Sequence, residues 1–256
     1  MLAHIAYVFD MKDPKIIYQS DFLRAVLHEG ASDTGALLCE FDYFNNKRDG
    51  FPDIRKSGRM VDHGFSRLII DTSLNNWFLS GDVPDLGRAL DNIAGDYDCH
   101  VSLCFSMGIM PALMFSKELR LQKIMAFSPV ISIFEDDILD RRFRSFRKNA
   151  THLEYRNLWK DGKLDIEGSM CFDPHHPIDA LQARLISKHY KGLVPVAMPL
   201  CGHPCTQVVK DALGFTAIQD LVINNEFDPR FPRALHQQSR AVSDLYKTRL
   251  ERKRKP

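Results

Sequence analysis

Residues 100–115 read HVSLCFSMGIMPALMF, and this stretch decides how the chain folds. An apolar run of strand length ends at Cys104, Ser106 follows, and an apolar segment with helical spacing begins directly after it. A serine at such a junction is typical of a nucleophile elbow, in which a sharp turn at the carboxyl end of a strand projects the hydroxyl. The turn favours small residues two positions either side of the serine. Gly108 meets this requirement, and Cys104 replaces the first glycine.

Two later segments also end in chemically active residues. Residues 168–174 read GSMCFDP, which predicts a strand that ends at Asp173 before a proline. Residues 193–200 read LVPVAMPL, a second apolar strand, and His203 lies in the CGHP loop beyond it. Along the chain the order is serine, acid, histidine. This is the order of the α/β-hydrolase triad, and it differs from the orders in other serine-hydrolase folds. The long separation of Ser106 from Asp173 predicts an inserted cap.

These segments resemble the α/β-hydrolase superfamily of serine hydrolases and, more narrowly, bacterial α/β-hydrolase-like proteins associated with surface polysaccharide. The likeness extends over about residues 65 to 215. It is carried by the stretches NNWFLSG (75–81), FSMG (105–108), AFSP (126–129), FDP (172–174) and CGHP (201–204). The resemblance implies an α/β fold with a mostly parallel sheet, helices on both faces and a small helical cap. It also implies acyl-ester chemistry on a substrate that is an acylated carbohydrate or glycoconjugate.

Composition agrees with a single α/β-hydrolase domain spanning 1–256 with a cap insertion at 135–165. The chain has 256 residues, and its formal net charge of +1 gives no reason to expect a nucleic-acid partner. No apolar run approaches the roughly 18 residues of a transmembrane segment, and the amino terminus lacks a secretory leader. We therefore expect a cytoplasmic protein whose cysteines are reduced.

Alternating apolar runs and helical patterns support a parallel sheet covered on both faces. Strands are expected at 5–9, 36–41, 67–70, 101–104, 123–127, 170–172 and 193–198. Helices are expected at 16–27, 86–93, 111–119, 177–189 and 232–251. Residues 44–65 are expected to form a hairpin or a loop.

Three residues are the candidate catalytic set: Ser106 as nucleophile, His203 as its base and Asp173 as the acid that orients His203. Asp179 is the alternative acid. It lies near the start of an expected helix, where an aspartate is common because it complements the helix dipole. Asp173 ends a strand, which is where this fold places its acid, and is therefore the first choice.

The candidate oxyanion hole combines the backbone N–H of Met107, which follows the nucleophile, with a second N–H from a loop. We expect that second donor after the strand at 67–70, from Ser73 or Leu74. Trp77 and Phe78 are candidates for the wall of the substrate pocket. A Trp-Phe pair just after a strand more often belongs to an ordinary core.

A metal site is the competing interpretation of the histidine region. Thiolate and imidazole ligands of the kind that zinc uses cluster there: Cys171, Asp173, His175, His176, Cys201, His203 and Cys205. The spacing of Cys201 and Cys205 differs from that of a paired-cysteine knuckle, so we expect no metal and no cofactor.

The functional prediction is therefore a serine hydrolase or esterase that forms an acyl-enzyme. An acyltransferase acting on a glycan would use the same residues. A non-catalytic α/β-hydrolase scaffold in polysaccharide handling is a further alternative, because Cys104 and Ile109 stand where glycine is usual. The sequence leaves the oligomeric state undetermined.

Overall fold

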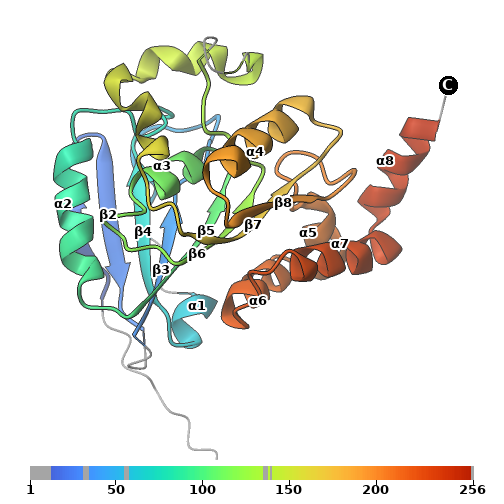
Figure 1. Ribbon diagram of the computed structural model, residues 1–256, viewed down its shortest axis with the longest axis horizontal. Helices are drawn as coiled ribbons and strands as arrows, with labels where there is room; N and C mark the ends of the chain where they lie inside the picture. Colours follow the sequence, from blue (N-terminus) through green and yellow to red (C-terminus); the bar gives the residue numbers. More distant parts are fainter. Residues whose placement is uncertain (1–12, 31–34, 55–57, 135–137, 139, 255–256) are drawn as a thin grey trace, which may run out of the picture.

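The computed structural model describes residues 13–30, 35–54, 58–134, 138 and 140–254. They form an eight-stranded sheet in the order β1-β2-β4-β3-β5-β6-β7-β8 (Figure 1). The strands are β1 (Lys15–Gln19), β2 (Leu23–His28), β3 (Ala36–Phe41), β4 (Ser66–Thr72), β5 (Cys99–Phe105), β6 (Lys123–Phe127), β7 (Glu167–Phe172) and β8 (Leu193–Ala197). β2 is antiparallel to β1 and β4, and all other neighbours are parallel.

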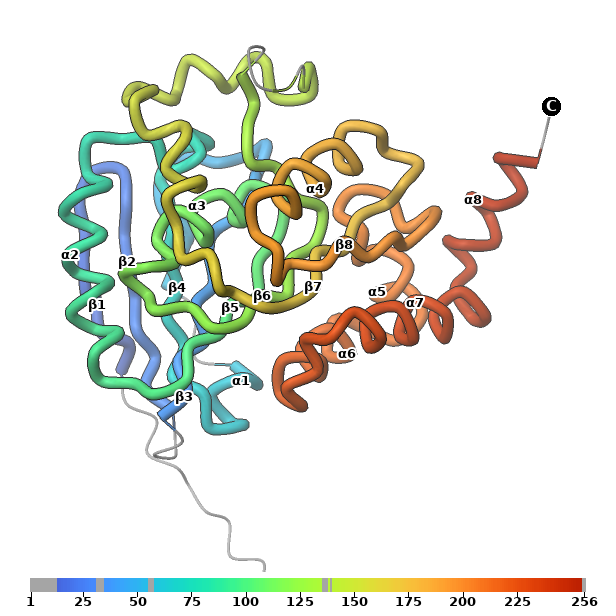
Figure 2. Tube along the Cα trace, viewed as in Figure 1, coloured from blue at the N-terminus to red at the C-terminus, as the bar shows by residue number. Residues whose placement is uncertain are grey.

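Helices cover the sheet on both faces, as the α/β prediction requires. They are α1 (Arg59–Asp62), α2 (Val83–Ala94), α3 (Ile109–Met114), α4 (Pro177–His189), α5 (Gln207–Leu213), α6 (Thr216–Ile223), α7 (Arg230–Val242) and α8 (Asp244–Arg254). Along the trace, the C-terminal helices α5 to α7 lie together on one side of the sheet, and α8 extends away from it (Figure 2). Among the described residues, no helix is both long and apolar enough to cross a membrane.

The two faces of the central strands belong to two separate hydrophobic clusters. Cys104 and Ala126 pack into one cluster, whereas their neighbours Leu103 and Met125 pack into the other. Successive side chains of a strand point to opposite faces, so a strand buried on both faces must be apolar throughout. This explains why β5 and β6 could be recognised as short apolar runs.

Most expected elements are confirmed, and two were wrong. Residues 16–27 form the antiparallel strands β1 and β2 instead of a helix, with Ser20 closing the turn between them. The Ser20 hydroxyl accepts hydrogen bonds from the N–H groups of Phe22 and Leu23. The expected single helix at 232–251 is divided into α7 and α8 at Ser243, whose backbone is extended. The expected strand at 5–9 lies outside the described residues.

The chain between β6 and β7 forms two 3-10 segments, η2 (Arg141–Asn149) and η3 (Leu153–Lys160), within the range expected for a cap. They lie at the top of the molecule in Figure 1. Phe143 and Trp159 are buried, and Phe143 contacts the rings of Phe44 and Trp77. We call the chain between β6 and β7 the insert. Its aromatic side chains fix it to the core. Residues 135–137 and 139 of the expected cap lie outside the described residues.

β3 ends against the turn that follows β5, since the two strands are neighbours in the sheet. Gly108 lies at the contact: a Cβ added there would come within 2.6 Å of the carbonyl oxygen of Phe41 and 2.9 Å of that of Asp42. Both obstacles are backbone atoms, so a side chain cannot be accommodated by a rotamer change. The glycine therefore permits β3 and the elbow to approach each other.

We expect Gly108→Ala to lower the free energy of unfolding by about 1–3 kcal/mol, the usual cost of overpacking a core. The matched control is Gly87→Ala in α2, where an added Cβ meets no atom closer than 3.8 Å. This control should stabilise the protein by up to about 1 kcal/mol, because alanine favours a helix interior. Urea unfolding of both variants measures the change in the free energy of unfolding, which should be negative for Gly108→Ala and positive for Gly87→Ala. Equal effects of the two substitutions would contradict the close approach.

Candidate active site

Ser106 occupies the strained turn that the sequence predicted. β5 ends at Phe105, a single 3-10 turn covers residues 106–108, and α3 begins at Ile109. The φ angle of Ser106 is +48°, in the left-handed region that a non-glycine residue adopts at a cost. Its Oγ lies 3.0 Å from Nε2 of His203, and the residue is 7% exposed. The predicted placement of Ser106 next to His203 is confirmed.

The partner of His203 on its other side is Asp179, which corrects the first choice of Asp173. Nδ1 of His203 lies 2.6 Å from Oδ2 of Asp179, the third residue of α4. An ionised carboxylate only accepts hydrogen bonds, so the proton must be on Nδ1. Nε2 is then free to accept the proton of the Ser106 hydroxyl. The order serine, acid, histidine survives the correction.

Asp173 contacts backbone N–H groups instead of the His203 ring. Oδ1 accepts from the N–H groups of His175 and Leu200, and Oδ2 accepts from that of Gly202 at 2.7 Å. The bond to His175, two residues ahead, is the local turn that an aspartate often makes before a break in the chain. Asp173 therefore ties the end of β7 to the loop that carries His203.

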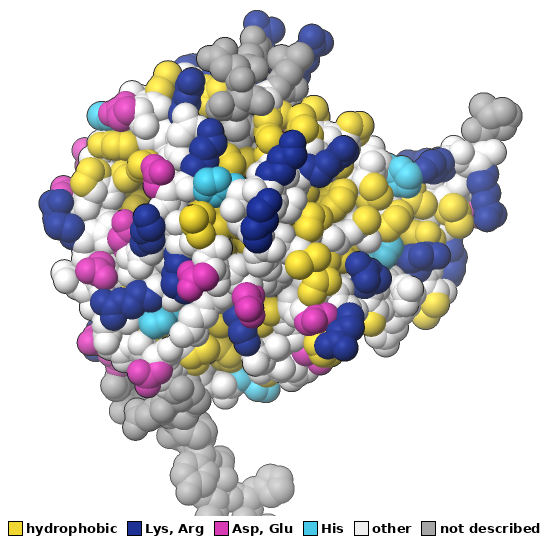
Figure 3. All heavy atoms as spheres, in the orientation of Figure 1, with side chains coloured by type: hydrophobic (Ala, Val, Ile, Leu, Met, Phe, Trp, Pro, Cys, Tyr) yellow, Lys and Arg dark blue, Asp and Glu magenta, His cyan; other side chains and the backbone are white. Residues whose placement is uncertain are grey.

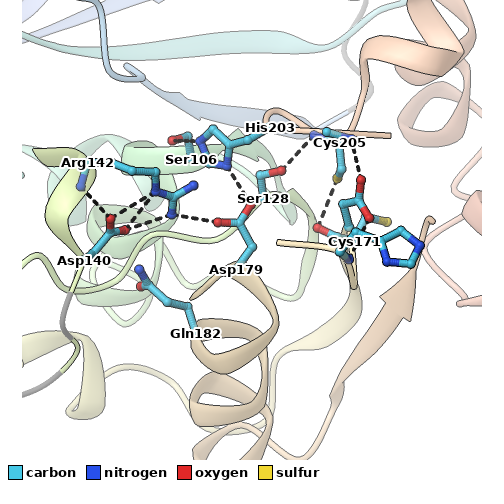
Figure 4. A network of polar contacts seen from close by, with 12 residues as sticks. Ser106, Ser128, Asp140, Arg142, Cys171, Asp179, Gln182, His203 and Cys205 are labelled. Atoms are coloured by element: carbon cyan, nitrogen blue, oxygen red, sulfur yellow. Dashed lines mark hydrogen bonds and ion pairs between the residues drawn. The ribbon is translucent and has the colours of Figure 1, made fainter. Parts of the chain in front are cut away.

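Asp179 also receives a cation from the insert. Nη2 of Arg142 lies 2.7 Å from its Oδ1, and the same guanidinium pairs with the buried Asp140. In Figure 4, Ser106, His203, Asp179, Arg142 and Asp140 lie in one connected row. Burial alone would raise the pKa of Asp179, but the hydrogen bond from His203 and the charge of Arg142 outweigh it and lower that pKa. The acid is therefore held ionised in a buried position.

Sequence reasoning assigned no role to Arg142 or Asp140. Both lie at the start of the stretch whose aromatic residues face the core, in which Phe143 is buried. Arg141 and Arg144 lie next to the same aromatic residues and are exposed, so the local sequence carried no signal that singled out this pair.

The residues expected to supply the second oxyanion donor lie after the wrong strand. β3, and not β4, adjoins β5, so the loop after β3 lies beside the elbow. Ser73 and Leu74 follow β4, and the N–H of Ser73 already donates to the carbonyl of Phe22. Met107 is buried directly after Ser106, and the role of its N–H stays a prediction.

Trp77 and Phe78 are core residues, which was the alternative interpretation of this pair. Both are fully buried, and both have left-handed φ angles of +55° and +60°. Phe78 packs on the edge of the Phe41 ring, and Trp77 contacts Phe44 and Phe143. These side chains join β3 to the insert, and neither residue lines the cavity that opens beside His203.

The cysteines near His203 are packed as small apolar residues. Cys171, Cys201 and Cys205 are fully buried, and burial raises the pKa of the Cys201 thiol to about 12. Backbone N–H of Cys205 donates to the Ser128 hydroxyl, which connects the histidine loop to the end of β6 (Figure 4). In the part of the chain that the structure describes, no three His, Cys, Asp or Glu side chains are grouped to hold a metal ion.

A cavity of about 660 Å³ opens beside His203. Its walls come from the loop after β7, the loop after β8 and helix α8. The His203 side chain is 19% exposed, whereas Ser106 is nearly covered. Solvent therefore reaches the serine–histidine pair from the histidine side.

Comparison with known proteins found no matching family model and no matching curated protein. Solved structures do match. The acetyl ester-xyloside bifunctional hydrolase of Caldicellulosiruptor lactoaceticus has a TM-score of 0.56 at 12% identity, over 86% of this chain and 97% of that one. The capsule O-acetyltransferase of Neisseria meningitidis serogroup A has a TM-score of 0.53 at 10% identity, over 81% and 93%. Together with the strand order and the elbow, these similarities establish that the chain has the α/β-hydrolase fold.

Proposed function

We propose that this protein is a serine hydrolase that cleaves an acyl ester through Ser106, His203 and Asp179. The observation that carries the proposal is the unbroken chain of hydrogen-bond contacts from the strained Ser106 through His203 to the buried Asp179. Its two contacts measure 3.0 Å and 2.6 Å. A serine hydroxyl needs a base within hydrogen-bond reach to become a nucleophile, and His203 is within that reach.

In the proposed reaction, Oγ of Ser106 forms a bond to the acyl carbon while its proton moves to Nε2 of His203. The tetrahedral intermediate then collapses, the bond from carbon to the alcohol oxygen breaks, and the proton passes from Nε2 to that oxygen. Water, or an acceptor alcohol, repeats the sequence in reverse and releases the acyl group from the serine. Asp179 keeps Nδ1 protonated throughout and stabilises the imidazolium.

The developing oxyanion requires donors that are fixed in advance. In this proposal the backbone N–H of Met107 is one, because it follows the nucleophile at the start of a helical turn. The second comes from the loop after β3. The N–H of Asp42 still pairs with β4 by donating to the carbonyl of Ile70. Tyr43 is therefore the first residue of this loop whose N–H is available for the oxyanion. The N–H of Tyr43 donates only to the Oδ1 of its neighbour Asp42, an exchangeable contact at an exposed position.

The proposed substrate is an acylated carbohydrate or glycoconjugate. Support comes from the sequence resemblance and from two proteins of the same fold that are described as an acetyl ester-xyloside hydrolase and a capsule O-acetyltransferase. Transfer to a glycan is the second candidate function, because hydrolysis and transfer differ only in the acceptor that attacks the acyl-serine. The unbroken hydrogen-bond contacts from Ser106 to Asp179 argue against a non-catalytic scaffold.

A fluorophosphonate probe should label the wild-type protein at Ser106 and should not label Ser106→Ala. The reason is that only a serine activated by a base attacks the probe at neutral pH. Mass spectrometry of the labelled peptide identifies the residue. Ser102→Ala, which removes a buried hydroxyl bonded to the carbonyl of Cys39, is the matched control and should keep the label. Equal labelling of the Ser106→Ala variant would refute the assignment.

Asp179→Asn should lower kcat far more than Asp173→Asn. Loss of the acid removes control of the His203 tautomer, a loss on the order of 10⁴-fold in the worked serine-protease case. Asp173→Asn should act mainly on stability, since the amide cannot accept all three backbone N–H bonds as a carboxylate does. Steady-state kinetics on a chromogenic acetate and urea unfolding separate the two effects. A larger kcat loss in Asp173→Asn would restore the original choice of acid.

Arg142→Met should destabilise the protein most near neutral pH, and its stability should fall less than that of the wild type on acidification. The pKa of Asp179 is lowered in the folded state, so its stabilising contribution is present above the ordinary value of about 3.9 and is lost as pH falls through the folded value. Removing the cation raises that folded pKa, so less stability depends on the ionised acid and the difference from the wild type narrows as pH falls. Urea unfolding from about pH 7 down to pH 3 measures it. The control Arg144→Met, at an exposed position of the same segment, should follow the wild type. Parallel curves for Arg142→Met and wild type would exclude this coupling.

A further inference from the structure

The cavity beside His203 has a strongly cationic wall. Helix α8 contributes Arg249, Arg252 and Lys253, and the loop after β7 contributes His175 and His176. Lys and Arg side chains, with histidines among them, gather at the end of the surface where α8 lies (Figure 3). The protein as a whole has a formal net charge of only +1, so this concentration of positive charge is local.

The described lining residues place one carboxylate against these cations. It belongs to Asp173, which is 2% exposed and accepts three hydrogen bonds from backbone N–H groups. Nζ of Lys253 lies 2.9 Å from a ring nitrogen of His175, so two basic groups share one corner. Within the described residues, Arg252 and Lys253 form no ion pair with a carboxylate. Cations that outnumber the carboxylates lining a cavity favour an anionic ligand there.

The position of the cavity indicates which half of an ester it would hold. His203 lines the cavity and Ser106 does not. In acyl-serine chemistry the histidine gives its proton to the leaving alcohol and later takes one from the acceptor. Both of these groups must therefore lie on the histidine side of the serine.

We propose that this cavity, the α8 anion site, binds a phosphate or carboxylate carried by the alcohol half of the substrate. The proposal rests on the function proposed above, because it assigns the cavity to the leaving group or the acceptor. Arg252 and Lys253 supply the charge. Arg249 holds the site in place, since its guanidinium donates to the carbonyl of Leu200 and to the side chain of Gln207.

Two sources could provide the same anion. It is attached either to the alcohol that leaves the acyl donor or to the alcohol that accepts the acyl group. The first is examined by comparing 7-acetoxycoumarin-4-acetate with neutral 7-acetoxy-4-methylcoumarin, which share the acetyl group and the coumarin leaving group. The second is examined by acetyl transfer from the neutral ester to glucose 6-phosphate against transfer to glucose.

The informative variant is the double substitution Arg252→Ser, Lys253→Ser. Its matched control is Lys247→Ser, Arg254→Ser, which removes the same charge from the same helix at positions outside the cavity wall. The ratio of kcat/KM for the anionic ester to that for the neutral ester should fall about tenfold in the first variant. This is the size expected for two partly exposed charge interactions. The control should keep the ratio of the wild type.

Added salt should lower the wild-type ratio of kcat/KM for the anionic ester to that for the neutral ester toward the ratio of the double variant. The reason is that salt screens exposed charges. If the anionic donor shows no such preference but transfer to glucose 6-phosphate does, the anion belongs to the acceptor. Ratios that are the same in the double variant and its control, for both donor and acceptor, would overturn the proposal.

A binding measurement separates this inference from the proposed catalysis. Calorimetric titration of inorganic pyrophosphate into Ser106→Ala protein should give binding that the double variant weakens about tenfold relative to its control. If the fluorophosphonate probe fails to label Ser106 while this binding persists, the site stands and the catalytic assignment fails. If labelling succeeds and pyrophosphate binds the double variant and its control equally, the α8 anion site is refuted and the catalytic assignment stands.

Discussion

The buried carboxylate of Asp179 is the constraint on which the active site depends. A fully buried charge is costly unless it is paired and hydrogen-bonded, and Asp179 meets both conditions through His203 and Arg142. Each partner comes from a different part of the chain. Helix α4 supplies the carboxylate, the loop after β8 supplies the imidazole, and the insert between β6 and β7 supplies the guanidinium. Docking of the insert through its aromatic residues is therefore coupled to the state of the acid.

The loop that carries His203 is fixed from several directions. Asp173 binds its backbone from the β7 side, and Ser128 binds the N–H of Cys205 from the β6 side. Arg249 approaches from α8 so closely that a Cβ on Gly202 would lie 2.9 Å from the guanidinium. Gly202 has a left-handed φ of +79°, the conformation that favours glycine. The last helix of the chain thus helps to position the base and forms the cationic wall beside it.

Much of the fold could be predicted because buried parallel strands must be apolar on both faces. The runs at β3 and β6 were located with the bounds that the structure has, and helix α4 likewise. The hairpin at residues 16–27 was missed because its apolar residues fit a helical spacing as well as an alternating one. The turn at Ser20, which satisfies its own backbone donors, was the overlooked signal. Short apolar segments do not distinguish the two structures by period alone.

The sequence by itself determined the elbow at Ser106, the histidine at 203 and their order around an acid, because strand ends and a small-residue turn leave local patterns. Only the tertiary structure shows that the carboxylate in contact with His203 is that of Asp179. Asp173 and Asp179 are close in sequence, and their roles differ by whether backbone N–H groups or an imidazole reach the carboxylate. The loop beside the elbow was also a tertiary outcome, since strand order in the sheet is set by pairing between distant segments. Local sequence carries no record of that pairing.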